Sequence, residues 1–248
     1  MFCRALPNRT QEASIQSKES CREIRYNIPF YYDGLQMFCG ISPNSTGGKQ
    51  RFIYTAQGQY DISCTTFSPD GRVFQIDYAG KAVENSGTAI GVRVKDGIVF
   101  GVEKLILSKM LEPSANRRIH SLDRTIGLTY AGMTADARQL VNKGRSEAKN
   151  YRGFYYSTIP TRVLNERLSL FVQAYTLYGH VRPFGCSIII GAWEDDGPQL
   201  YTIDPSGISY GYYGTAVGKA KQAAKGELEK LKLSEMTARE AVKEIARM

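Results

Sequence analysis

The stretch FSPDGRVFQIDYAGKAVENSGTAIGVRVKDGIVFGV, from Phe67 to Val102, places a turn, a helix and two strands in succession. Its start, Ser68–Gly71, has turn chemistry, because proline fixes φ and glycine permits a tight reversal. The segment Val73–Asn85 carries apolar residues at helical spacing. The runs Thr88–Val94 and Ile98–Val102 are rich in β-branched residues and flank an Asp-Gly pair, a strong hairpin signal. The stretch therefore predicts a helix that leads into a β-hairpin.

Periodicity in the rest of the chain predicts a strand pair, two helices, three strands and two more helices. These elements are expected at Arg118–Leu122, Ile126–Ala131, Thr134–Tyr151, Thr161–Tyr178, Gly185–Trp193, Leu200–Ile203, Ile208–Tyr213, Val217–Leu231 and from Thr237 to the end, where Glu240 completes a capping box. Two antiparallel sheets with helices on their outer faces satisfy this order, because each sheet covers one face with the other sheet and one with helices. The predicted class is α+β, as a four-layer αββα sandwich.

The first 57 residues differ from the remainder, since they show no sustained helical or strand period. We expect residues 1–57 to form a poorly ordered extension and residues 58–248 to form the folded domain.

Composition narrows the classes of partner. The net charge of +8 is spread along the chain, and no cluster of Lys and Arg interleaved with aromatics predicts a nucleic-acid site. No run of 18 apolar residues predicts a membrane span, and the start lacks the apolar core of a signal peptide. The five cysteines are scattered and form no metal-binding pairs, so we expect reduced thiols, no metal, no cofactor, and a location in the cytoplasm and nucleus.

Few residues offer catalytic chemistry. The two histidines, His120 and His180, are far apart in sequence; we interpret both as structural, with His180 at a helix end. Thr88 is the remaining candidate, because an amino-terminal threonine can use its own α-amine as the base. That chemistry requires cleavage of the chain before Thr88.

The segment YDISCTTFSPDGRVFQIDYAGKAVENSGTAIG, Tyr60 to Gly91, resembles the amino-terminal signature of proteasome α subunits. The segments GVEKLILSK, ADAR, AYTLYGHVRPFGCS and LYTIDPSGISYGYYGTAVGKAKQAAK are also similar to α-subunit sequences. The resemblance implies the four-layer αββα fold of the Ntn-hydrolase type. The family pattern continues beyond the last helix into two strands and an acidic tail, so we expect the domain to be truncated at its C-terminus.

The resemblance also implies a non-catalytic subunit of a threonine-type endopeptidase complex. Active subunits of the family need a threonine, an acid sixteen residues later and a lysine thirty-two residues later. Counting from Thr88 gives Lys104 and His120, whereas counting from Gly87 gives Glu103 and Ile119. Neither count gives the triad.

Roles carried over by position concern the gate, the ring and the activators. Tyr60, Asp61 and Pro69 match residues that hold the gate open at the pore rim. The helix Val73–Asn85 matches the one that packs between neighbours in the ring. Its matching residues are Phe74, Gln75, Tyr78 and Ala79.

Arg118 matches the basic residue that anchors activator carboxyl termini. It departs from the lysine of the general pattern, although arginine can also pair with a carboxylate.

We therefore expect a structural and gating subunit of the 20S proteasome that acts in ubiquitin-dependent degradation. Its expected partners are α subunits in a seven-membered ring, β-ring subunits and regulatory activators, with no nucleic acid or membrane. Two alternatives remain open: a self-processing amino-terminal threonine hydrolase, and a basic adaptor that binds through residues 1–57.

Overall fold

The computed structural model describes residues 60–106, 108–112 and 115–248, and the backbone of residues 30–32 and 35–37. The chain divides into two compact units, Met1–Phe52 and Ile53–Met248. In the first unit, strands β1 (Phe30–Tyr32) and β2 (Leu35–Met37) form an antiparallel pair. The predicted extension of residues 1–57 otherwise lies outside the described residues.

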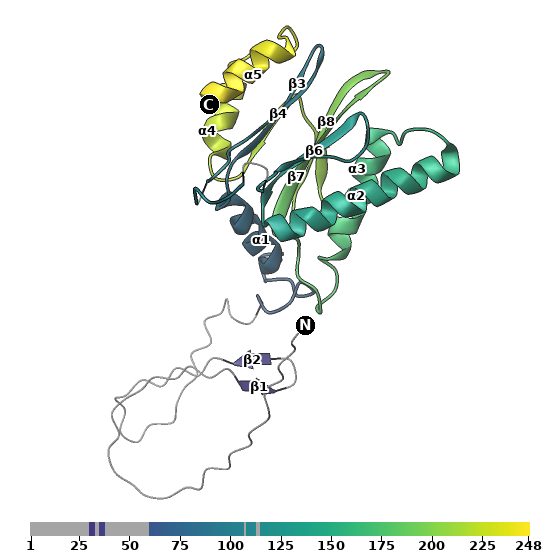
Figure 1. Cartoon of the computed structure of the whole chain (residues 1–248). Coiled ribbons are helices and arrows are strands. Elements are labelled where there is room, and N and C mark those ends of the chain that lie inside the picture. The colour runs from purple at the N-terminus through teal and green to yellow at the C-terminus, as the bar shows by residue number, and fades with distance from the viewer. Residues whose placement is uncertain (1–29, 33–34, 38–59, 107, 113–114) are drawn as a thin grey trace, which may run out of the picture. The chain divides into compact units, whose positions relative to one another are not determined.

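The second unit contains two antiparallel sheets (Figure 1). One has three strands in the order β10-β3-β4, and the other has five in the order β5-β6-β7-β8-β9. The strands are β3 (Ala89–Val94), β4 (Gly97–Val102), β5 (Ile119–Ser121), β6 (Ile126–Gly132), β7 (Cys186–Glu194), β8 (Gly197–Ile203), β9 (Ser209–Gly211) and β10 (Gly214–Val217). The predicted β3–β4 hairpin is confirmed, with Val94 opposite Gly97 at its turn.

Helices cover the outer faces of both sheets (Figure 1). Helices α2 (Thr134–Tyr155) and α3 (Thr161–Ala174) pack on the five-stranded sheet, and α4 (Lys221–Leu228) and α5 (Ala238–Arg247) pack on the three-stranded sheet. Helix α1 (Phe74–Glu84) contacts β6 and β7. The predicted α+β, four-layer αββα arrangement is confirmed.

Where the two sheets pack together, side chains of one sheet occupy the space left by glycine residues, which have no Cβ, on the other sheet. A Cβ at Gly127 or Gly191 would lie 2.9 or 2.8 Å from the ring of Phe100, and a Cβ at Gly91 would lie 2.8 Å from Ile189. Phe100 of β4 therefore occupies space that only glycine leaves on β6 and β7. This close packing fixes how the two sheets face each other.

Both boundaries of the helix predicted at Val217–Leu231 were wrong. Residues 214–217 form strand β10, which pairs with β3, so Val217 ends a strand and does not start the helix. The helix expected at Val217–Leu231 is the shorter α4. A short apolar run is ambiguous between strand and helix, and pairing with β3 decides the outcome here.

The second predicted helix also ends earlier than expected. Helix α3 stops at Ala174 with Tyr175 as its C-cap, so His180 does not lie at a helix end. Its ring instead lies 5.7 Å from that of Tyr178 in the following turn.

Candidate functional site: the gate segment, helix α1 and the Thr88 network

The turn that precedes α1 is held by Ser68 and capped by glycine. The backbone N–H of Arg72 donates to Oγ of Ser68 at 3.0 Å, and the N–H of Gly71 donates to the Ser68 carbonyl at 2.8 Å. Gly71 has a φ of +74°, a conformation that favours glycine. The predicted turn is confirmed, and it leaves Pro69 exposed at its tip.

Helix α1 has a buried side and an exposed side. Ala79 and Val83 are buried against the sheets, whereas Tyr78 is 39% exposed. The rings of Phe74 and Tyr78 stack at 6.4 Å on successive turns. The predicted helix is thus confirmed, and one face of it remains open for a partner.

Asp61 is tied to this helix by two side chains. The amide Nε2 of Gln75 donates to the Asp61 carbonyl, and the hydroxyl of Tyr78 donates to Oδ2 of Asp61 at 3.3 Å. Desolvation and the nearby Asp61 carboxylate raise the pKa of Tyr78. The structure therefore brings together Asp61, Gln75 and Tyr78, and the predicted gate and ring roles of these residues stay predictions.

Tyr60 and Pro69 are placed differently. Tyr60 is half-buried at the start of the described segment, and Pro69 lies on the separate turn. Within the described part of the chain, no hydrogen bond joins that turn to Asp61. The predicted gathering of these three residues at a pore rim stays a prediction.

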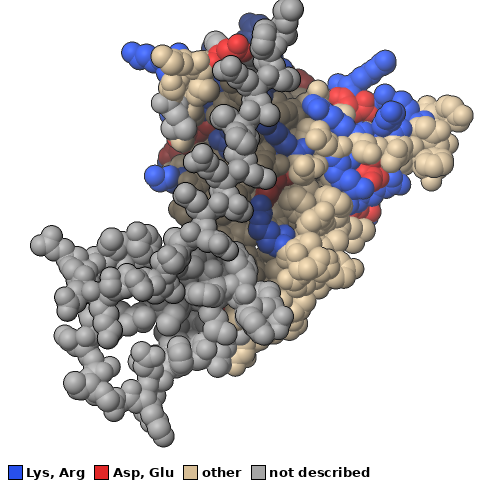
Figure 2. Space-filling view, turned by 60° about the horizontal axis from the view of Figure 1, so that its bottom comes forward, with Lys and Arg blue, Asp and Glu red and all other residues tan. Residues whose placement is uncertain are grey.

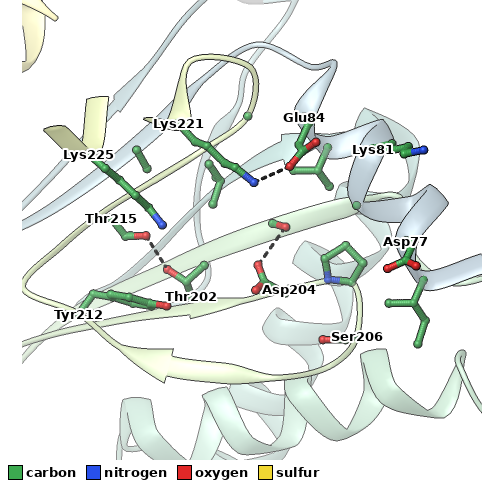
Figure 3. Close-up of a pocket in the computed structure, with 18 of the residues that line it drawn as sticks. Asp77, Lys81, Glu84, Thr202, Asp204, Ser206, Tyr212, Thr215, Lys221 and Lys225 are labelled. Atoms are coloured by element: carbon green, nitrogen blue, oxygen red, sulfur yellow. Dashed lines mark hydrogen bonds and ion pairs between the residues drawn. The ribbon is translucent and has the colours of Figure 1, made fainter. Parts of the chain in front are cut away.

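Under α1 lies a polar cavity of about 440 Å³ (Figure 3). Lys221 at the start of α4 pairs with Glu84 of α1 at 2.5 Å. On the sheet side, the hydroxyl of Ser187 donates to Asp204 at 3.3 Å. Figure 3 shows Lys225 extending from α4 toward this space. Sequence reasoning missed the cavity, because its walls come from segments more than a hundred residues apart.

Thr88 is linked to Gly87 by a peptide bond. Its backbone N–H and its hydroxyl oxygen both form hydrogen bonds. Its backbone N–H donates to Oε2 of Glu103 at 2.9 Å, and its Oγ1 accepts a hydrogen bond from the N–H of Ala220 at 3.2 Å. The residue is only 7% exposed. The hydrogen bond from Thr88 holds the pKa of Glu103 below its usual range, with help from the charges of Arg118 and Lys219.

Arg118 lies in the same network and bonds to backbone. Its guanidinium donates to the carbonyls of Gly87 at 2.9 Å, Glu103 at 2.9 Å and Tyr130 at 2.7 Å. Gly87 makes room for it, since a Cβ there would lie 2.7 Å from Nη1. Burial lowers the pKa of Arg118, against the opposing influence of Tyr130 and Glu103. The Arg118 side chain thus joins three parts of the chain: the residues before β3, the residue after β4, and strand β6.

Counting along the sequence did not identify this grouping. The structure places Glu103 and Arg118 beside Thr88, whereas the two counts paired Thr88 with Lys104 and His120, and Gly87 with Glu103 and Ile119. His120 instead stacks on Tyr130, with ring centres 6.0 Å apart.

Among the described residues, no group of three or more His, Cys, Asp or Glu side chains could hold a metal ion. The helices of the same ranges include none that combines the length and hydropathy of a bilayer span.

The fold and site define an αββα protein of the proteasome type. The proteasome subunit family matches residues 83–248, and the N-terminal signature of A-type proteasome subunits matches residues 60–82. The chain belongs to the proteasome subunit family and carries its α-type signature. It is therefore a structural α-type subunit of the 20S core.

Similar proteins come from distant eukaryotes. The chain is 66% identical over 189 residues to "Proteasome subunit alpha type-3" of Acanthamoeba castellanii, covering 76% of this chain and 75% of the relative. It is 59% identical over 189 residues to the Spinacia oleracea protein of the same name, covering 76% of each. It is also 50% identical over 192 residues to "Probable proteasome subunit alpha type-7" of Saccharomyces cerevisiae, covering 76% of this chain and 67% of the relative.

Proposed function

We propose that this chain is a non-catalytic subunit that helps to form and gate the seven-membered α ring of the 20S proteasome in ubiquitin-dependent degradation. Its partners are neighbouring α subunits, the β ring and regulatory activators. The observation that carries the proposal is the double tie from Asp61 to Gln75 and Tyr78 of α1. Because this tie joins the gate segment to the helix, the position of α1 in the ring sets where the chain leaves toward the pore.

The absence of catalysis is supported by the surroundings of Thr88. An amino-terminal threonine nucleophile needs a free α-amine as its base. The nitrogen of Thr88 is a peptide nitrogen bonded to Gly87, and its proton is donated to Glu103. The segment before it is an ordered helix whose Ala79 and Val83 are buried in the fold, so its removal would expose core residues.

A more detailed proposal concerns how Arg118 binds the carboxyl terminus of an activator. Three of the five guanidinium N–H groups, one on Nη1 and two on Nη2, bond to the carbonyls of Glu103, Gly87 and Tyr130. The two N–H groups that remain are on Nε and Nη1. They lie on different edges of the planar guanidinium group, so they cannot both bond to one carboxylate. We propose that Arg118 shapes the pocket through its backbone bonds and offers an activator carboxyl terminus its charge and a single donor.

Two further proposals concern organisation and location. We propose that residues 1–57 form an extension to the subunit domain of residues 58–248, and that the subunit works in the cytoplasm and nucleus.

The first test is native mass spectrometry of core particles purified through a tag on this chain. We expect one copy in each α ring and an amino terminus that lies before Thr88. Particles that lack the chain would contradict the structural proposal, and cleavage between Gly87 and Thr88 would favour the threonine-hydrolase alternative.

The second test addresses the gate. In purified particles, the double variant Asp61→Asn with Tyr78→Phe removes the carboxylate–hydroxyl tie. We expect it to lower activator-stimulated peptide hydrolysis and to leave hydrolysis without activator unchanged. Asp70→Asn on the exposed turn is the matched control, and equal stimulation in the two variants would refute the gating role.

A further inference from the structure

Two arginines of α2 lie on one face of the helix, and one of them bonds to β5. Arg138 and Arg145 are seven residues apart, which is about two helical turns, so their side chains emerge on the same side. Nε of Arg145 donates to the carbonyl of Ser121 at 3.0 Å. This bond places the face of α2 that carries both arginines against strand β5.

A third arginine joins them from the segment before β5. Burial lowers the pKa of His120, and the positive charges of Arg145, Arg138 and Arg117 lower it further, against a hydrogen bond to the Arg117 backbone. The charge of each of the three arginines therefore acts on one imidazole ring, and all three residues are exposed. We call Arg117, Arg138 and Arg145 the arginine cluster.

No ion pair joins the cluster to a carboxylate within the part of the chain that the structure describes. The acidic side chains of α2 and of the β5–β6 turn already pair with other cations. The pairs are Asp123 with Arg152 at 2.6 Å, Asp136 with Arg182 at 2.6 Å, and Glu147 with Lys143 at 2.7 Å and Arg167 at 3.0 Å. Figure 2 shows the wider excess, with more basic than acidic side chains on the face in view.

We infer that the arginine cluster is a docking surface for an acidic segment of a neighbouring subunit, bound through carboxylates to the exposed guanidinium groups of Arg117, Arg138 and Arg145. This inference rests on the proposed function, because it needs a partner chain in the particle. Guanidinium groups present paired donors that match carboxylates, and arginine is enriched in protein interfaces. A protein carboxylate is favoured over nucleic acid, because the cluster is compact and not part of a basic stripe along the chain.

The first test uses the purified full-length chain and a fluorescent poly-glutamate peptide. We expect Arg138→Glu with Arg145→Glu to weaken binding by about tenfold, equivalent to about 1.4 kcal/mol. The matched control is Arg239→Glu with Lys243→Glu, which makes the same charge change at two exposed residues of α5. We expect this control to bind as the unmodified chain does.

Several results would overturn the inference. These are equal weakening in both double variants, no binding by the unmodified chain, or a clear preference for RNA or inorganic polyphosphate over poly-glutamate. Arg138→Gln with Arg145→Gln removes the charge without reversing it, and its thermal unfolding reports whether the fold is kept. If the Glu variant fails to fold, the Gln variant must show the weakened binding.

The second test measures incorporation into core particles. If the unmodified chain does not incorporate, the proposed function fails and the neighbouring subunit fails with it as the occupant, while the peptide test still decides whether the arginine cluster binds carboxylates. If the unmodified chain and both double variants incorporate equally, the function stands and the inference is wrong. We expect only Arg138→Glu with Arg145→Glu to incorporate poorly, and a Glu→Arg change on the partner subunit to restore it.

Discussion

The centre of the five-stranded sheet and the β4 edge of the three-stranded sheet are packed to different degrees. Strands β6 and β7 are buried along almost their whole length under α2 and α3. Strand β4 of the three-stranded sheet is only half-buried throughout, and it borders an apolar groove of about 650 Å³ between β4, α4 and α5. The difference indicates that most of the packing stability of this unit resides in the five-stranded layer.

A change in the well-packed layer should have the largest effect. Leu168 of α3 is fully buried among residues of α2 and the five-stranded sheet. We expect Leu168→Ala to lower the free energy of unfolding by about 2–5 kcal/mol, because it leaves a cavity in a closed core. Urea unfolding measures the change. Leu170→Ala on the same helix, at a side chain 65% exposed, is the control and should stay within about 0.5 kcal/mol.

The second largest effect is expected at Arg118, which joins the two sheets. We expect Arg118→Met to cost about 1–3 kcal/mol, because it leaves the carbonyls of Gly87, Glu103 and Tyr130 without their donor. Thermal unfolding measures the loss, with the exposed Arg117→Met as control. If the two variants melt at the same temperature, Arg118 does not hold the sheets together.

The less packed layer should respond more weakly. Ile245 of α5 packs over Gly101 of β4 and is only partly buried. We expect Ile245→Ala to cost about 1 kcal/mol, since the groove beside it can absorb part of the change. Hydrogen exchange of the α5 amides measures it, and Val242→Ala, at a side chain 54% exposed, is the control. A loss as large as that of Leu168→Ala would remove the contrast between the layers.

The smallest effect should appear as a pH dependence at Glu103. Its pKa is lowered in the folded chain, chiefly by the hydrogen bond from Thr88, so its contribution to stability is present at neutral pH. That contribution is lost as the pH falls through the lowered pKa of this carboxyl. Unfolding followed between pH 7 and pH 3 should show a steeper loss for the unmodified chain than for Glu103→Gln. Because Glu103 is exposed, solvent screening keeps the difference small.

Local sequence patterns predicted the β3–β4 hairpin and the turn before α1, because Asp-Gly and Ser-Pro-Asp-Gly determine the conformation of adjacent residues. They also predicted α2 and α5; in α5, Thr237 and Glu240 form the expected capping box. They failed at Val217, where pairing with β3 sets the boundary, and at the end of α3, where Tyr175 is the C-cap.

The site was predictable only in part. The signature predicted a gate role for Tyr60 and Asp61, which stays a prediction, and the structure supplied the bonds from Gln75 and Tyr78 to Asp61. The grouping of Thr88, Glu103 and Arg118 did not follow from counting. Pairing of β3 with β4 places Glu103 beside Thr88, and the packing of one sheet on the other brings Arg118 to them.

The sequence by itself determined the αββα layers and the α-type class, because hydrophobic period and turn chemistry are local properties and the signature is a continuous segment. Only the tertiary structure decided how Arg118 is used, which strand Arg145 bonds to and where the polar cavity lies. Each of these depends on segments that are distant in the chain and meet only when the sheets and helices pack.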